Sequence, residues 1–232
     1  MSAPAAIRPP TLVELAGAQS DDGFVRPAWR GRVHLLALIV ACPLTVVLAI
    51  RSDGARARAG VIVFAAGVCS MLAVSTTYHR WVHSPRRRAA WRRADHATIF
   101  AAIAGTFTAL ALVSLRHTWL IPLLVCMWTA ASIGAAVQIT GWRHADRVGA
   151  VMYIASGWAG VLIVPPLLRV GGVVPVALLL GGGLLYTVGA AGFSRRWPTL
   201  RPETFSYHEV WHVFTVAAAG VHLAALWIVA TA

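Results

Sequence analysis

Long apolar runs recur along the chain after residue 32, and they constrain its fold more than any other feature. A run of about 18 or more such residues is long enough to cross a membrane as an α-helix. Only 12% of all residues are charged, against 58% hydrophobic. The pattern therefore predicts an all-α membrane protein whose residues 33–232 form a seven-transmembrane-helix bundle. The expected spans are roughly 33–50, 59–81, 94–115, 119–140, 148–168, 172–193 and 208–230. Two consecutive prolines, Pro165 and Pro166, are expected to close the fifth span.

The distribution of basic residues predicts the orientation of the bundle. All 20 basic residues are arginines, and 15 of them lie in the N-terminal tail or in the connections after the second, fourth and sixth spans. The connections on the other side of the membrane carry the remaining five arginines. An excess of basic residues marks the cytoplasmic side, so we expect a cytoplasmic N-terminus and an outside C-terminus. Residues 1–32 are polar, contain four prolines and are interpreted as a short cytoplasmic tail, mostly disordered.

The net charge of +12 allows nucleic-acid binding in principle, but the arginines sit in short connections between apolar spans. The run Arg86–Arg88, followed by Arg92 and Arg93, is interpreted as a cytoplasmic loop that sets the topology and also contacts anionic lipid. No nucleic-acid partner is expected. The cysteines are isolated inside apolar runs and are interpreted as small core residues.

His208 and His212 begin the last span, in the pattern HExxH. Histidines four residues apart lie on one face of a helix, about 40° apart around its axis. This spacing allows two imidazoles to reach one metal, and it recurs in zinc sites. The alternative is a pair of helix-end histidines at the membrane–water boundary.

The predicted topology brings further polar side chains to the same membrane depth. His79 ends the second span and Asp95 starts the third, so both should lie at the cytoplasmic end together with His208 and His212. An even number of spans would place the last span's start on the opposite side. Three imidazoles without a thiolate favour zinc, and a three-histidine set leaves a coordination position for water. We therefore predict a Zn²⁺ site formed by His79, His208 and His212.

Several neighbouring residues have competing interpretations. Asp95 is a candidate to deprotonate or orient a water, or to anchor a histidine N–H; alternatively it is a helix-start acid paired with an arginine. Ser75 shares a helical face with His79 and could hold water or a substrate oxygen, although membrane serines often bond to their own backbone.

Glu209 is expected to pair with a loop arginine rather than to act as a protease-like base. His34 lies at about the membrane depth of the predicted zinc site. His222 lies about 15 Å further along the last span and could bond to a neighbouring helix.

Taken together, these motifs resemble the bacterial hemolysin III family, a branch of the PAQR (progestin and adipoQ receptor) group. The resemblance extends from about residue 26 to the C-terminus and is carried by Ser75-x-x-x-His79, residues 94–100, residues 104–108, residues 207–212 and Arg30-Gly31-x-x-His34.

The resemblance implies a seven-helix bundle in the bacterial cytoplasmic (inner) membrane with its N-terminus inside. It also implies zinc near the cytoplasmic face, held by His79, His208 and His212 with Asp95 and Ser75 nearby. The related adiponectin receptors are associated with ceramide hydrolysis, and alkaline ceramidases share the motif pattern.

The leading hypothesis is a zinc-dependent intramembrane hydrolase of a lipid amide or ester, with Asp95 and Ser75 as catalytic residues. The alternative is a non-enzymatic sensor or regulator of membrane state, with structural zinc and a membrane lipid as ligand. A pore or transporter is less favoured, because the spans lack the ladder of charged residues expected along an ion path.

Overall fold

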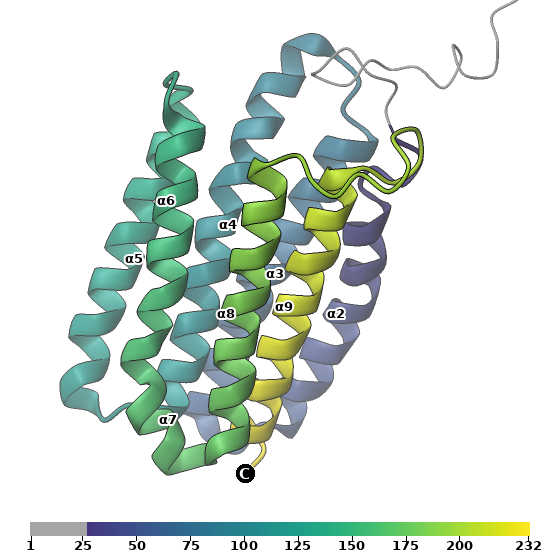
Figure 1. The fold of residues 1–232 in the computed structure, drawn as a ribbon. Helices are drawn as coiled ribbons and strands as arrows, with labels where there is room; N and C mark the ends of the chain where they lie inside the picture. The colour runs from purple at the N-terminus through teal and green to yellow at the C-terminus, as the bar shows by residue number, and fades with distance from the viewer. Residues whose placement is uncertain (1–26) are drawn as a thin grey trace, which may run out of the picture.

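The computed structural model describes residues 27–232, and the predicted bundle is confirmed there. Seven helical segments are long and apolar enough to cross a membrane, and they run side by side (Figure 1). Six of the segments are single helices. These are α2 (Arg32–Arg51), α3 (Gly54–Arg80), α4 (Pro85–Ser114), α5 (His117–Thr140), α8 (Val173–Ser194) and α9 (Tyr207–Ala230). The protein is thus a multi-pass integral membrane protein.

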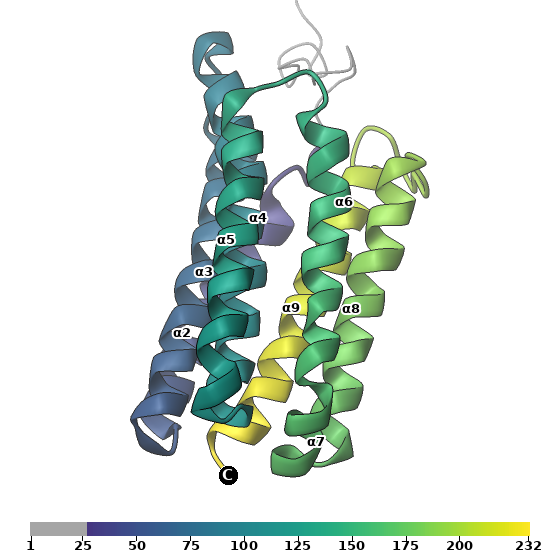
Figure 2. The same cartoon turned by 90° about the vertical axis from the view of Figure 1, so that its left-hand side faces the viewer.

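The fifth crossing is built from three pieces. Helix α6 (Ala145–Trp158) passes into the 3₁₀ turn η1 (Ala159–Ile163) and then into the short helix α7 (Val164–Gly171), as seen at the base of the bundle (Figure 2). The prolines at 165 and 166 were expected to close this span, but the helix continues past them. Because a proline has no N–H, the preceding turn loses its α-helical partners and tightens into 3₁₀ geometry.

The arginine-rich segment after α3 is not a loop, and that prediction was wrong. Residues 86–93 form the first turns of α4, which rises beyond the neighbouring helices (Figure 1). Pro85 occupies the start of the helix, where its missing N–H costs nothing, and arginine is a good helix former. The basic side chains are therefore carried on a rigid helical extension.

Small residues allow α3 and α4 to pack closely at the centre of the bundle. A Cβ atom added at Gly67 would lie 2.6 Å from the carbonyl oxygen of Ala101, and one at Gly60 would lie 3.1 Å from that of Ala109. Such close backbone approach is a principal source of helix association in lipid. The rigid α3–α4 pair fixes the relative positions of the C-terminal end of α3 and the N-terminal part of α4.

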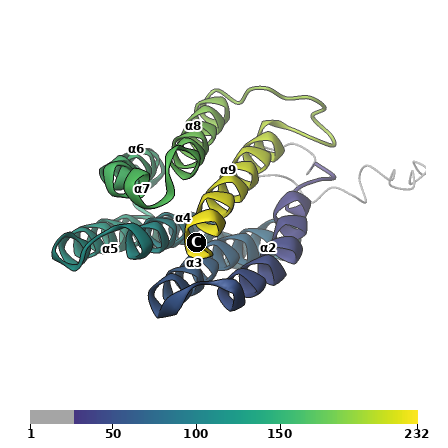
Figure 3. The ribbon, with the colours of Figure 1, turned by 90° about the horizontal axis from the view of Figure 1, so that it is seen from below.

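Helix α9 packs against α2, α3, α4 and α8, and viewed along the bundle axis it lies between α8 and α2 (Figure 3). Its N-terminus lies at the same end of the bundle as the C-terminus of α3, whereas the chain's C-terminus lies at the opposite end (Figure 1). The candidate side chains on α3, α4 and α9 are therefore brought to one end, as the odd number of spans predicted.

The residues just before α2 form a turn that is attached to the α8–α9 connection. The amide N–H groups of Ala28 and Trp29 donate to the carbonyl oxygens of Glu203 and Thr204, each at 3.1 Å. We call residues 27–31 the lead-in turn. Residues 1–26 of the predicted tail lie outside the described residues.

Candidate metal centre

Three histidines from two helices meet near one end of the bundle. His79 lies in the last turn of α3, and His208 and His212 lie in the first two turns of α9. Their candidate ligand nitrogens all lie within 4.8 Å of one another. The Nε2 atoms of His79 and His208 are 3.2 Å apart. The predicted trio therefore forms a group that could hold a metal ion.

The spacing of these nitrogens and their surroundings fit a metal ion. Two ligands bound tetrahedrally to zinc at 2.0–2.1 Å lie about 3.3 Å apart, close to the distance between the His79 and His208 nitrogens. A ring nitrogen of His212, Nδ1, is buried and has no hydrogen-bond partner among the described residues. Such an unpaired group is costly in the interior unless something occupies the site. An all-imidazole set is also typical of zinc and similar divalent ions.

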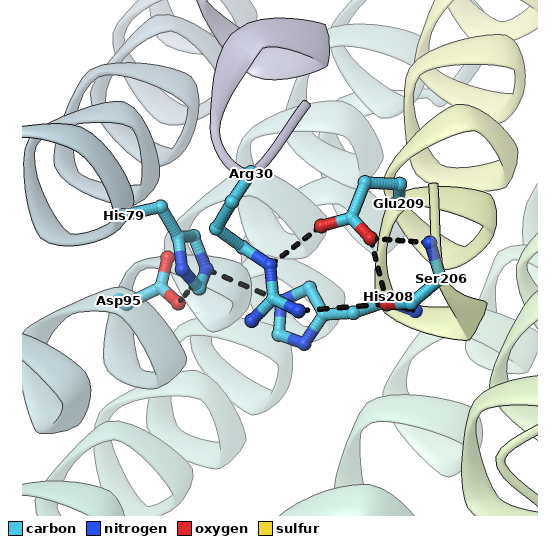
Figure 4. A network of polar contacts seen from close by, with 6 residues as sticks. All are labelled: Arg30, His79, Asp95, Ser206, His208 and Glu209. Carbon is cyan, nitrogen blue, oxygen red and sulfur yellow. Dashed lines mark hydrogen bonds and ion pairs between the residues drawn. The ribbon is translucent and has the colours of Figure 1, made fainter. Parts of the chain in front are cut away.

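Asp95 lies beside this trio. Its Oδ2 atom is 3.6 Å from Nε2 of His79, the same nitrogen that faces His208, so the carboxylate lies on the side of the ring where a metal would bind (Figure 4). The Ser75 side chain, one turn before His79, is buried and adjoins the Asp95 carboxylate. Arg92, which was the alternative partner for Asp95, forms an ion pair with Asp146, in which its Nη1 atom lies 2.9 Å from Oδ2.

Comparison with known proteins shows the family to which the chain belongs. The sequence model of the family described as "Haemolysin-III related" matches residues 23–223. The chain belongs to the haemolysin-III-related family. It is 30% identical over 191 residues to "Hemolysin-3" of Bacillus cereus. The aligned region covers 81% of this chain and 84% of that protein.

Two further relatives extend the comparison. "Hemolysin-3 homolog" of Bacillus subtilis (strain 168) is 26% identical over 189 residues, or 80% of this chain and 85% of that protein. "Monocyte to macrophage differentiation factor" of Homo sapiens is 24% identical over 204 residues, or 84% of this chain and 80% of that protein. The similarity spans nearly the whole transmembrane region.

In this haemolysin-III-related protein, Glu209 is turned away from the trio and stabilises the start of α9 (Figure 4). The buried carboxylate accepts hydrogen bonds from the backbone N–H and the hydroxyl of Ser206, each at 2.7 Å, and forms an ion pair with Arg30 at 2.5 Å. Ser206 in turn caps the helix by accepting from the N–H of His208. The expected arginine partner is confirmed, although it comes from the lead-in turn rather than from a loop between spans.

Sequence reasoning did not identify the lead-in turn as part of the site. Gly31 has a φ of +75°, and a Cβ atom there would lie 2.8 Å from Cβ of His79. Glycine alone accommodates both the left-handed backbone and this close approach. The signal was present in the Arg30-Gly31-x-x-His34 motif, which places Arg30, Gly31 and His34 within about one turn of one another.

Two further histidines, His34 and His222, differ in their relation to the trio. The His34 ring stacks on that of His212, with centroids 3.9 Å apart and planes 11° apart, so His34 adjoins the trio. The side chain of His222 bonds to the carbonyl oxygen of Leu179 on α8 at 3.1 Å, which confirms the expected bond to a neighbouring helix. It takes no part in the trio.

Proposed function

We propose that this haemolysin-III-related protein is a zinc-dependent intramembrane hydrolase of a lipid amide or ester. The observation that carries the proposal is the convergence of three imidazoles, a carboxylate and a hydroxyl from α3, α4 and α9 at one end of a membrane bundle. Zinc held by His79, His208 and His212 would supply a Lewis acid and lower the pKa of water to about 7.

The roles of the protein's own side chains follow from their positions. Asp95 takes a proton from the water whose oxygen adds to the substrate carbonyl, and it returns that proton to the leaving amine or alcohol as the C–N or C–O bond breaks. The Ser75 hydroxyl adjoins the Asp95 carboxylate and orients it. Glu209 is excluded from the role of base in this conformation, because both of its oxygens are bonded at the start of α9.

We further propose that the end of the bundle carrying the trio faces the cytoplasm. The excess of arginines at that end supports this orientation, since 13 of the 18 arginines in residues 27–232 lie there. The helical extension of α4 carries exposed arginines and would contact anionic lipid headgroups of the inner leaflet. A lipid substrate would then reach the site from the same leaflet.

The second candidate function is a non-enzymatic sensor or regulator of membrane state in which the metal is structural. The burial of two of the three ligands favours it, because His79 and His212 are only 4% and 2% exposed and structural metal sites are closed. This candidate predicts that removal of the metal lowers the melting temperature and that no lipid is hydrolysed.

The first experiment measures metal per chain in purified wild-type protein and in the His212→Ala variant. We expect about one zinc ion per wild-type chain and loss of it in the variant. Wild-type protein that is folded and contains no metal would refute both candidate functions.

The second experiment separates the hydrolase from the regulator. Wild type and the Asp95→Asn variant are incubated with a long-chain ceramide as the amide and a diacylglycerol as the ester. We expect turnover that falls about 100-fold or more in the variant while zinc is retained. Absence of turnover in metal-loaded wild type would favour the regulator, and unchanged turnover in the variant would refute the role given to Asp95.

A further inference from the structure

His34 lies directly against the candidate metal ligand His212, although the two residues are far apart in the sequence. The two rings are nearly parallel, with an 11° angle between planes and centroids 3.9 Å apart. His34 is 3% exposed and comes from α2, a helix that contributes no ligand to the trio. A flat contact of this kind restricts rotation of the His212 ring about its side-chain bonds.

The hydrogen bonds of Thr215 determine which nitrogen of His34 carries the proton. The Thr215 hydroxyl donates to the backbone carbonyl oxygen of His212 at 2.9 Å, so only its lone pairs face His34. Nε2 of His34, 3.1 Å away, must therefore be the donor. Thr215 lies in the turn of α9 that follows His212, so this bond fixes the His34 ring relative to the helix that carries the ligand.

The neighbours of a ligand histidine usually set the plane of its ring, and that plane decides whether a ring nitrogen points at the metal. For His212, the neighbour that lies flat against the ring is His34.

We propose that His34 is a positioning residue of the metal centre, which holds the His212 imidazole in its ligating orientation through the flat face of its ring. The inference rests on the proposed metal site. The hydrogen bond with Thr215 anchors the His34 ring, and the stacking contact transmits that orientation to His212. A flat aromatic side chain at position 34 should therefore preserve the metal site, whereas an aliphatic one should not.

The test compares His34→Phe, which keeps a flat ring, with His34→Leu, which is apolar but not flat. Zn²⁺ affinity is measured in detergent by competition with a chromophoric chelator, and the geometry is read from the visible absorption of bound Co²⁺. We expect His34→Leu to weaken Zn²⁺ binding by about tenfold or more and to alter the Co²⁺ spectrum. His34→Phe should remain within about threefold of wild type and keep its spectrum. His117→Leu, an exposed position at the other end of the bundle, is the matched control.

Three results would overturn parts of the reasoning separately. Wild-type affinity and spectrum in His34→Leu would show that the ring does not position His212. An equal loss in His34→Phe and His34→Leu would assign the effect to the ring nitrogens rather than to stacking. Absence of metal in wild-type protein would refute the metal centre itself. The melting temperatures of the metal-free proteins show whether a loss of affinity arises from unfolding.

Discussion

Replacing Arg30 by methionine tests how the lead-in turn supports the metal centre. The Glu209 carboxylate is fully buried, and Arg30 is 14% exposed. The variant would leave the charge of Glu209 compensated only by the two hydrogen bonds from Ser206. Removal of one partner from a buried ion pair costs about 3–5 kcal/mol. Because Arg30 retains some contact with solvent, we expect the lower end, about 3 kcal/mol.

The predicted loss is measurable as a change in thermal stability. For domains of this size each kcal/mol shifts the melting temperature by about 2–4 °C, so the Arg30→Met protein should melt about 6–12 °C below wild type in the same detergent. Zinc affinity should fall as well, because Arg30 and Ser206 hold the first turn of α9, which carries His208. Both quantities can be measured on one preparation.

A double-mutant cycle identifies the cause of the loss. Glutamine at position 209 can still serve in the capping arrangement at the helix start, so Arg30→Met should cost much less in a Glu209→Gln background than alone. Additive losses would refute the ion-pair argument. Arg92→Met is the matched control, because the Arg92–Asp146 pair is 45% and 56% exposed and such pairs contribute less than about 1 kcal/mol.

Three further predictions follow from the same geometry. Gly31→Ala should lower both zinc affinity and melting temperature. The control is Gly54→Ala, because Gly54 has a similar φ of +77° but no neighbour within 4 Å, so this variant should lose only about 1–2 kcal/mol of stability through the strained backbone. Equal losses of stability in both variants would contradict the contact argument. Ser206→Ala should destabilise by about 1 kcal/mol through loss of the cap, while Ser84→Ala, whose side chain makes no capping bond, should leave the melting temperature nearly unchanged. Zinc removal by a chelator should lower the melting temperature of wild type and leave that of His212→Ala unaffected. An equal fall in melting temperature in both proteins would argue against this site.

The seven-span architecture followed from the sequence because lipid leaves few alternatives. A backbone in hydrocarbon must satisfy its own hydrogen bonds, so each long apolar run becomes a helix. The odd number of spans then placed His79, Asp95 and His208 at one end of the bundle, as the structure confirms.

Local sequence patterns were less reliable where two tendencies compete. The arginine-rich residues 86–93 were interpreted as a loop because most of them are charged, yet their helix propensity and Pro85 extend α4 beyond the bundle. The double proline at 165 and 166 was expected to end a span, but it only tightens the preceding turn. In both places the helix-start position of proline decided the outcome.

The sequence by itself determined the helices, their order and the depth of the histidines, because periodicity and apolar length act along the chain. Only the tertiary structure showed that Arg30 pairs with Glu209 and that His34 stacks on His212. These contacts depend on how far each helix is rotated about its axis and on how closely α2 approaches α9. Close packing of small residues sets those quantities, and its effect emerges only when residues distant in sequence meet.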